Sequence, residues 1–311
     1  MKLKNILYSL MLAGFCLSFT ACETDEPDES VSVITIDKYE PNPFDLWLEE
    51  NFVAPYNIAF KYRYEQIESD LNYYTVPANL EESIILAHLV KYTCCDLYDE
   101  VAGVEFTRSY FPKMFFLIGE WEYKNNGTII LGTAEGGKKI LLSGVNHLKT
   151  YMSRGADAVN YYYLKTIHHE FTHILNQTVT IPNEYKFITG EDYVEDLWSE
   201  SPYDSGYLTR GFISAYSQNS YTEDFAEMLS MYITNTPEQW AAWLEQAGDA
   251  ADLIEAKLDI VRSYMQSGFG IDIDELRSAL MRRQNEIFTG KVDLEDISLK
   301  SSNQPNEEVE E

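Results

Sequence analysis

The sequence predicts an α+β protein, with a mixed sheet in the N-terminal half and a mainly helical C-terminal half. Three observations lead to this class. β-rich runs separated by glycines lie between residues 113 and 145. Apolar residues recur at helical spacing through most of the chain beyond residue 156. The third observation is the run His169-Glu170-Phe171-Thr172-His173, near the start of the helical half.

The first 21 residues are typical of an export signal. Lys2 and Lys4 precede an apolar run over Ile6–Phe19, which is too short to span a membrane. The run ends at Phe19-Thr20-Ala21-Cys22, which resembles the processing site of bacterial lipoproteins. We therefore expect cleavage before Cys22 and a lipid anchor on Cys22. The alternative is an ordinary secretory signal cut near Ala21.

Acidic segments flank a single predicted domain over residues 33–291. Residues 22–32 form a Pro-containing tether and residues 292–311 a tail, and both lack the apolar content that folding requires. The full chain carries a formal charge of −28, and losing the two signal lysines leaves 21 basic against 51 acidic residues, or −30. This charge argues against nucleic acid and against direct binding to an anionic bilayer, so attachment to a membrane has to come from the lipid.

The predicted elements of the N-terminal half differ in type along the chain. Tyr56–Tyr64 alternates between apolar and other residues and indicates a strand. The other elements are an amphipathic helix over Pro43–Asn51, a helix over Leu80–Tyr98, and β-rich runs over Lys113–Tyr123 and Thr128–Val145. Cys94 and Cys95 fall within the second helix, where we interpret them as a buried pair with no redox or zinc-binding role, because adjacent cysteines form a disulfide only with a strained backbone.

The C-terminal half contains four predicted helical stretches. The first spans Ala156–Gln177 and the second Ser220–Thr234. Thr236-Pro237-Glu238-Gln239 indicates a helix start, because a capping residue is followed by proline and then by glutamine at the third helical position. We expect the last two stretches near Gln239–Ser267 and Asp274–Phe288.

The His169–His173 run predicts a metal site. Residues four apart share one face of a helix, so both histidines can bind the same ion, and Glu170 beside them can take a proton from water. The apolar face of this helix is made by Leu164, Ile167, Phe171, Ile174 and Leu175. Because the histidines point roughly opposite to that face, we do not interpret them as core residues.

A catalytic Zn²⁺ ion needs a third protein ligand. His88 and His147 lie in unlike contexts, whereas Glu223 and Glu227 share one face of the second helix. One of the two acids can bind the metal while the other accepts the N–H of a ligand histidine. The alternative for Glu223 is a capping box with Ser220, which would leave Glu227 as the ligand.

These residues resemble the gluzincin metallopeptidases, and in particular sites of the lethal-factor type. The resemblance rests on His169-Glu170-Phe171-Thr172-His173 followed by Glu223-Asp224-Phe225-Ala226-Glu227. It implies a zincin-like fold, with His169, His173 and Glu223 as zinc ligands and Glu227 behind a histidine. A tyrosine stands seven residues before the zinc glutamate in such sites, and Tyr216 has this position, although a loop tyrosine can also serve packing alone.

Most of the mature chain also resembles the substrate-import-associated zinc metallohydrolase lipoproteins. Segments that carry the resemblance are Asn51–Ile58, Leu131–Lys139 and the metal region. It implies a protein anchored to the outer membrane, facing the cell surface or the periplasm. Components of an outer-membrane nutrient importer are then possible partners.

Together, these observations predict a lipid-anchored metallopeptidase that hydrolyses peptide or protein substrates with metal-activated water and one catalytic Zn²⁺ ion. Glu170 is the expected general base, and Tyr216 the expected hydrogen-bond donor to the oxyanion. We expect the substrate to add to an edge strand within Lys138–Val145. The alternatives are a zinc amidase acting on glycan or cell-wall amides, and a non-catalytic surface lipoprotein that binds polymers.

Overall fold

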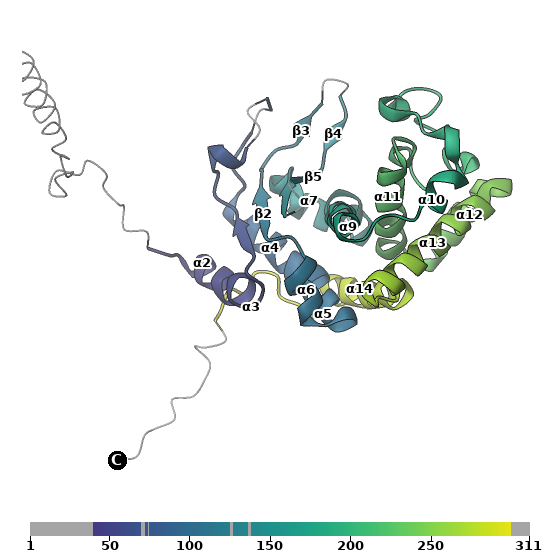
Figure 1. Ribbon diagram of the computed structural model, residues 1–311. Helices are drawn as coiled ribbons and strands as arrows, with labels where there is room; N and C mark the ends of the chain where they lie inside the picture. Colours follow the sequence, from purple (N-terminus) through teal and green to yellow (C-terminus); the bar gives the residue numbers. More distant parts are fainter. Residues whose placement is uncertain (1–39, 70–71, 74, 125–126, 136–137, 300–311) are drawn as a thin grey trace, which may run out of the picture. The chain divides into compact units, whose positions relative to one another are not determined.

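The computed structural model describes residues 40–69, 72–73, 75–124, 127–135 and 138–299. The predictions for the export signal, for Cys22 and for residues 22–32 lie outside the described residues. Beyond residue 39, the described chain combines many helices with a small mixed sheet (Figure 1). The predicted mixture of helix and sheet is therefore confirmed.

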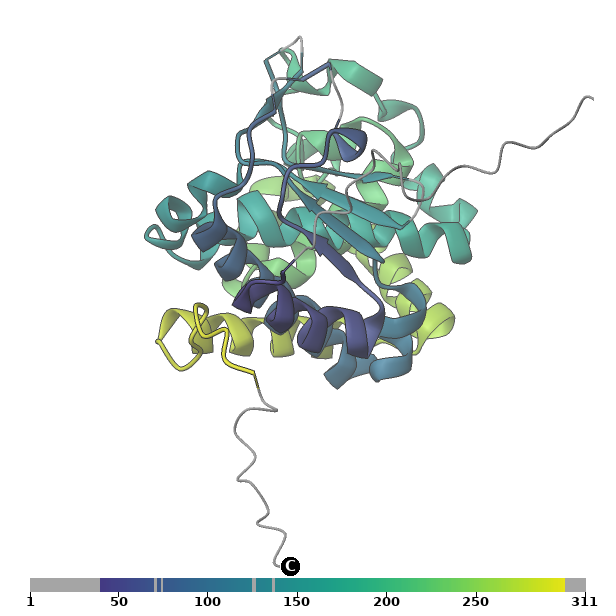
Figure 2. The same ribbon diagram turned by 90° about the vertical axis from the view of Figure 1, so that its left-hand side faces the viewer.

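The main sheet contains four strands in the order β1 (Ala59–Lys61), β2 (Met114–Leu117), β6 (Lys139–Leu142) and β5 (Gly132–Glu135). β1, β2 and β6 are parallel, whereas β5 runs antiparallel to β6. A separate hairpin pairs β3 (Glu122–Tyr123) with β4 (Ile129–Ile130). Figure 2 shows the sheet strands side by side, with the N-terminal helices and the last helix of the chain beneath them.

Two predictions about the strands need correction. The strand predicted over residues 56–64 forms but is shorter, because Tyr56 still belongs to a helix and the strand ends at Lys61. The edge strand predicted within Lys138–Val145 lies inside the sheet, since β6 pairs with both β2 and β5. Among the described strands, β5 forms the edge that faces the helical half.

Helices precede the sheet as well as follow it. The predicted helix over Leu80–Tyr98 forms without interruption and continues to Ala102, with a π-helical turn over Lys91–Cys95 that holds both buried, unbridged cysteines. The helices before and beside the sheet are α2 (Pro43–Leu48), α3 (Ala54–Tyr56), α4 (Leu80–Val90), α5 (Asp96–Ala102), α6 (Val104–Tyr110) and α7 (Leu148–Met152).

The motif helix begins with α8 (Ala156–Val159), passes through a π-helical turn over Asn160–Leu164 and continues as α9 (Lys165–Thr178). The stretch predicted near Gln239–Ser267 is two helices rather than one, because Gly248 interrupts it with a positive φ angle. Thr236 and Gln239 form the expected capping box. The helices that follow α9 are α10 (Asn183–Ile188), α11 (Tyr221–Thr234), α12 (Pro237–Ala247), α13 (Ala251–Phe269) and α14 (Ile273–Phe288).

Helix α9 lies between the sheet and α11 (Figure 1). Its predicted apolar face, including Ile167, Phe171 and Leu175, is buried in the main core. β5 approaches α9 closely at Gly132, where a Cβ atom would lie 2.7 Å from both the Leu141 carbonyl oxygen and Thr166 Cγ2. Glycine at this position lets the edge strand run directly beside the motif helix.

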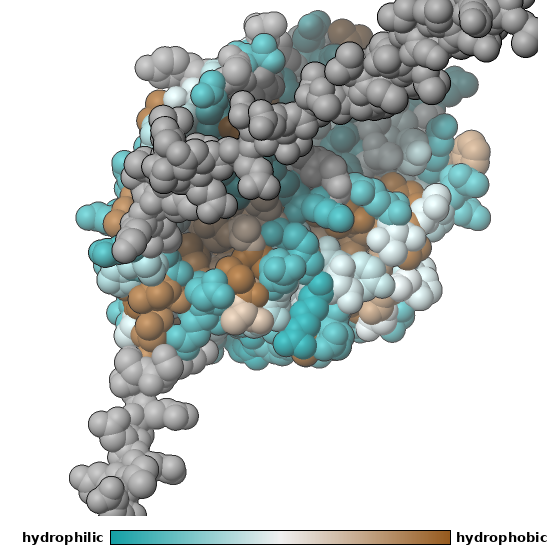
Figure 3. Space-filling model, turned by 60° about the vertical axis from the view of Figure 1, so that its left-hand side comes forward, coloured by the Kyte–Doolittle hydropathy of each residue, from teal (hydrophilic) through white to brown (hydrophobic). Residues whose placement is uncertain are grey.

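The chain beyond α14 continues to contact the core. Leu294 is buried, Val292, Ile297 and Leu299 pack against the core, and the Asp296 carbonyl oxygen lies 3.0 Å from His88 Nε2. The ordered domain therefore extends past residue 291, into the segment that we assigned to the acidic tail. The face drawn in Figure 3 carries hydrophilic residues with scattered hydrophobic ones. Within the described residues, no helix has the length and apolar character needed to cross a bilayer.

Candidate metal centre and active site

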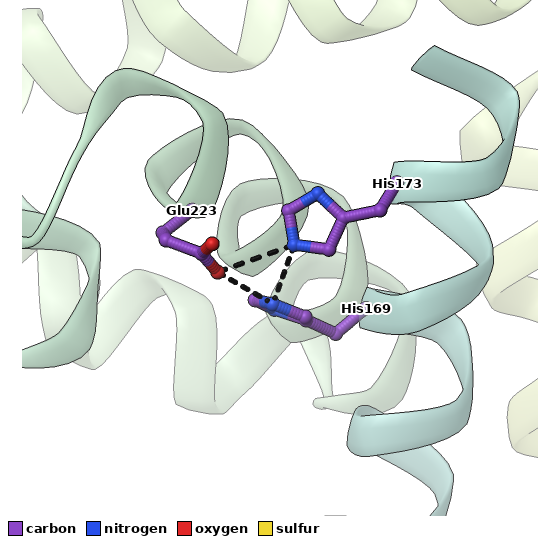
Figure 4. Close-up of side chains that lie close together, drawn as sticks. All are labelled: His169, His173 and Glu223. Atoms are coloured by element: carbon purple, nitrogen blue, oxygen red, sulfur yellow. Dashed lines mark hydrogen bonds and ion pairs between the residues drawn. The ribbon is translucent and has the colours of Figure 1, made fainter. Parts of the chain in front are cut away.

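Three side chains from two helices point toward one another. His169 and His173 come from consecutive turns of α9, and Glu223 comes from the first turn of α11 (Figure 4). Glu223 Oε2 lies 3.0 Å from His169 Nε2 and 3.2 Å from His173 Nε2, and the two nitrogens are 3.1 Å apart. His169 is buried and the other two are half-buried. The group is therefore partly screened from water but open on one side.

The spacing of these three atoms fits a metal ion. Ligands bound tetrahedrally to zinc at about 2.0–2.1 Å are about 3.3 Å from one another. The observed separations of 3.0–3.2 Å are close to that value. Two imidazoles and one carboxylate are also a typical catalytic zinc set that leaves a position for water.

Glu223 makes only half of the capping box that was its alternative role. Ser220 Oγ accepts a hydrogen bond from the Glu223 backbone N–H and thereby caps α11. The Glu223 carboxylate, however, contacts the two histidines. Although burial raises the pKa of Glu223, these histidine contacts hold it well below its usual value.

Glu227 lies one turn further along α11, behind His169. Its Oε1 atom is 2.9 Å from His169 Nδ1, although this N–H is not well aligned for a hydrogen bond, and 2.9 Å from Lys165 Nζ. Ser214 donates a hydrogen bond of 2.7 Å to Oε2. Burial raises the pKa of Glu227, but the charge of Lys165 and the contact with His169 outweigh it and keep the group ionised. The buried carboxylate can thus orient the His169 ring.

The surroundings of His169 favour a positive charge. Burial alone would lower the pKa of His169, yet the contacts with Glu223 and Glu227 raise it to about 10 in the protein alone. Such a strongly anionic environment is suited to a bound cation.

Glu170 and Tyr216 lie together in the cleft beside this group. Both line a cavity of about 410 Å³ and a neighbouring cavity of about 510 Å³, so they stand where the two cavities meet. The Tyr216 ring is 5.9 Å from the His169 ring and packs edge-on against Trp198 at 5.0 Å. Burial, reinforced by the charges of Glu223 and Glu170, raises the pKa of Tyr216, so its hydroxyl stays protonated and can donate a hydrogen bond.

Some residues of this cleft could not be found from the sequence. Ser214 and Trp198 lie in the irregular segment between α10 and α11, where no periodicity indicates which side chains turn inward. The three remaining histidines stay away from the cluster. His88 contacts the Ile84 and Asp296 carbonyl oxygens, His147 contacts Glu120, and the buried His168 contacts the Tyr98 hydroxyl at 3.0 Å.

Comparison with known proteins gives a consistent result. The family model described as "putative zinc-binding metallo-peptidase" matches residues 37–274. The crystal structure of a "putative zinc-binding metallo-peptidase" from Bacteroides caccae is 38% identical in sequence, with a TM-score of 0.71, and the match covers 86% of this chain and 100% of that one. No curated protein matches the chain. With the family model spanning most of the sequence, this chain belongs to the family of zinc-binding metallopeptidases that the model describes.

Proposed function

We propose that the protein is a zinc-dependent peptidase of the gluzincin type, with His169, His173 and Glu223 as the ligands of one ion. The convergence of these three side chains at 3.0–3.2 Å is the observation that carries the proposal. A zinc ion at this position would polarise the scissile carbonyl and acidify a water molecule.

The chain's own residues have distinct tasks in this reaction. Glu170 takes the proton of the attacking water and returns it to the leaving amine. Tyr216 donates a hydrogen bond to the oxyanion, a type of contact worth about 3 kcal/mol. Glu227, held by Lys165 and Ser214, keeps the His169 ring in position.

The test compares Glu170→Gln with the wild-type protein. The amide keeps the size of the side chain but cannot accept the proton, so hydrolysis of a peptide library should fall by about 10²–10⁴-fold while zinc content stays the same. Product analysis by mass spectrometry would show which bonds are cut. A variant that retains more than about a tenth of the activity would contradict the role of Glu170 as general base. Cleavage of cell-wall amides alone would replace the peptidase by an amidase.

We also propose that Cys22 carries a lipid that holds the domain at the outer membrane, where it would work with a nutrient importer. The support is the processing-site pattern before Cys22 and the acidic segment behind it. Cys22→Ser protein should appear in the soluble fraction of the cell, whereas continued membrane association would rule out the lipid as the only anchor.

A further inference from the structure

The segment between α10 and α11 carries Tyr216, and its only regular elements are short helical turns. Such turns make few main-chain hydrogen bonds, so other contacts have to fix the segment. Tyr216 begins one of these turns, Tyr216–Gln218, and its ring packs against Trp198 and His169. The position of the Tyr216 hydroxyl therefore depends on how this turn is held.

Gln218, the last residue of the turn, is fully buried and makes hydrogen bonds with both ends of its amide. Its Nε2 atom donates to the carbonyl oxygen of Ala215, directly before Tyr216, at 3.0 Å, and to that of Tyr203 at 2.8 Å. Its Oε1 atom accepts two hydrogen bonds from Arg210, of 2.9 Å from Nε and 2.8 Å from Nη2. The hydrogen-bonding capacity of the amide is thus filled by the protein itself.

Arg210 links this amide to another stretch of the same segment. Its Nη2 atom also donates to the carbonyl oxygens of Ser205, at 2.8 Å, and of Tyr203, at 3.2 Å. The main chain adds a further link, because the Gln218 carbonyl oxygen accepts a hydrogen bond of 2.7 Å from the Val194 N–H. The two side chains and this bond therefore join three parts of the irregular segment around the Tyr216 turn.

The same turn is also connected to the metal cluster. The Ser217 N–H donates to Ser214 Oγ at 3.1 Å, and Ser214 in turn donates to Glu227 at 2.7 Å. Tyr216 is therefore held through Ser214 to the metal cluster and through Gln218 to the rest of the segment. This matters for catalysis, because a group that acts on a transition state has to be placed to within about 0.5 Å, and an error of about 1 Å can lower a rate about 100-fold.

We propose that Gln218 is a positioning residue which, together with Arg210, holds the turn so that the Tyr216 hydroxyl meets the oxyanion. Neither Gln218 nor Arg210 lines the two cavities of the cleft, so both act through Tyr216 and not on the substrate. This inference rests on the proposed peptidase function, because that function gives Tyr216 its role in hydrolysis.

The test is Gln218→Met, a change of similar size that removes all four hydrogen bonds of the amide. We expect kcat for a peptide substrate to fall about ten-fold, while KM and zinc content stay unchanged. Gln284→Met is the matched control, since Gln284 is also a buried glutamine, hydrogen-bonded to Asn160, but belongs to α14. It should lower Tm to a similar extent and leave kcat unchanged.

A double-mutant cycle separates positioning from a general loss of order. If Gln218 acts through Tyr216, Gln218→Met should cause no further loss of kcat once Tyr216→Phe has removed the hydroxyl. Two losses that multiply would overturn the inference, as would an unchanged kcat in Gln218→Met. If Gln218→Met does not fold, Arg210→Lys takes its place in the cycle, because lysine keeps the charge but not the planar fork of donors.

Hydrogen exchange tests the turn without any measurement of activity. The Asn219 N–H donates to the Tyr216 carbonyl oxygen at 2.9 Å, so this amide should exchange faster in Gln218→Met than in the wild type or in Gln284→Met. If the zinc-loaded wild type cuts no peptide, the proposed function fails, whereas faster exchange would still support the role of Gln218 in holding the turn. Equal exchange in the three proteins would overturn that role.

Discussion

Glu223 and Asp224 are neighbours on α11, yet their carboxylates are balanced in different ways. Glu223 turns toward His169 and His173, at 3.0 and 3.2 Å. Asp224 turns into the core and pairs with Lys257 of α13 at 2.7 Å, with both side chains fully buried.

The Asp224 cluster is built entirely from the protein's own groups. Tyr193 donates a hydrogen bond of 2.9 Å to Asp224 Oδ2. Lys257 also donates to the Gly211 carbonyl oxygen at 2.9 Å, and its Nζ atom lies 4.0 Å from the centre of the Phe212 ring. Burial lowers the pKa of Lys257 and raises that of Asp224, and the short contact between them opposes both shifts.

The Glu223 cluster is not balanced in this way. Glu223 and Glu227 bring two negative charges, of which Lys165 offsets one, and in the protein alone only a proton on His169 offsets the other. The remaining charge and the ligand atoms around it are suited to a divalent cation. The comparison teaches that one acidic side chain of α11 has its charge offset by a lysine of the fold, whereas the other lies in a cluster whose charge an ion from solution could offset.

The largest expected effect follows from a change in the buried Lys257–Asp224 pair. Lys257→Met should lower the free energy of unfolding by about 3–5 kcal/mol, because it leaves the Asp224 carboxylate buried without a cation. Urea unfolding with and without zinc measures the change, which should be the same in both conditions. Lys291→Met, at an exposed position, is the control and should stay within about 0.5 kcal/mol of wild type. A loss below about 1 kcal/mol for Lys257→Met would show that the buried pair contributes no more than a surface pair.

Removal of the metal should lower stability through the Glu223 cluster. With free zinc at 100 times the dissociation constant, chelation should lower the free energy of unfolding by about 2.7 kcal/mol. Differential scanning calorimetry with and without chelator would show the shift in Tm. Glu223→Ala should abolish this shift, whereas Lys257→Met should retain it. A shift that persists in Glu223→Ala would place the ion elsewhere.

The smallest expected effect is the difference in zinc affinity between variants of Glu223 and Glu227. Glu227→Ala should weaken zinc binding by about 10–100-fold, the usual cost of losing a group that supports a ligand, and Glu223→Ala should weaken it more. Competition with a chromophoric chelator measures both. If Glu227→Ala is the more damaging change, the roles of the two residues are reversed.

Periodicity predicted which residues of the motif helix share a face. Ile167, Phe171 and Leu175 are buried in the core, as their spacing indicates, and the two histidines contact Glu223 of α11. Periodicity could not show what covers the polar face. Because α11 packs along it, His169 is only 5% exposed, although it belongs to the polar face of its helix.

The sheet was harder to predict, because strand order depends on contacts between distant segments. The position of β6 nevertheless had a signal in the sequence. Ile140, Leu141 and Leu142 are consecutive apolar residues, which is typical of a strand covered on both faces, and all three are buried. The Lys257–Asp224 pair had no such signal, since its members lie 33 positions apart and each has an ordinary place in an amphipathic helix.

The π-helical turn over Asn160–Leu164 affects how this protein can tolerate insertions and deletions. Such a turn holds one residue more than an α-helical turn, so it shifts the phase of every residue that follows it. Deleting one residue there would restore a regular α-helix and rotate His169 and His173 by about 100° relative to α8. We therefore expect natural length variation in this helix to be confined to its two ends.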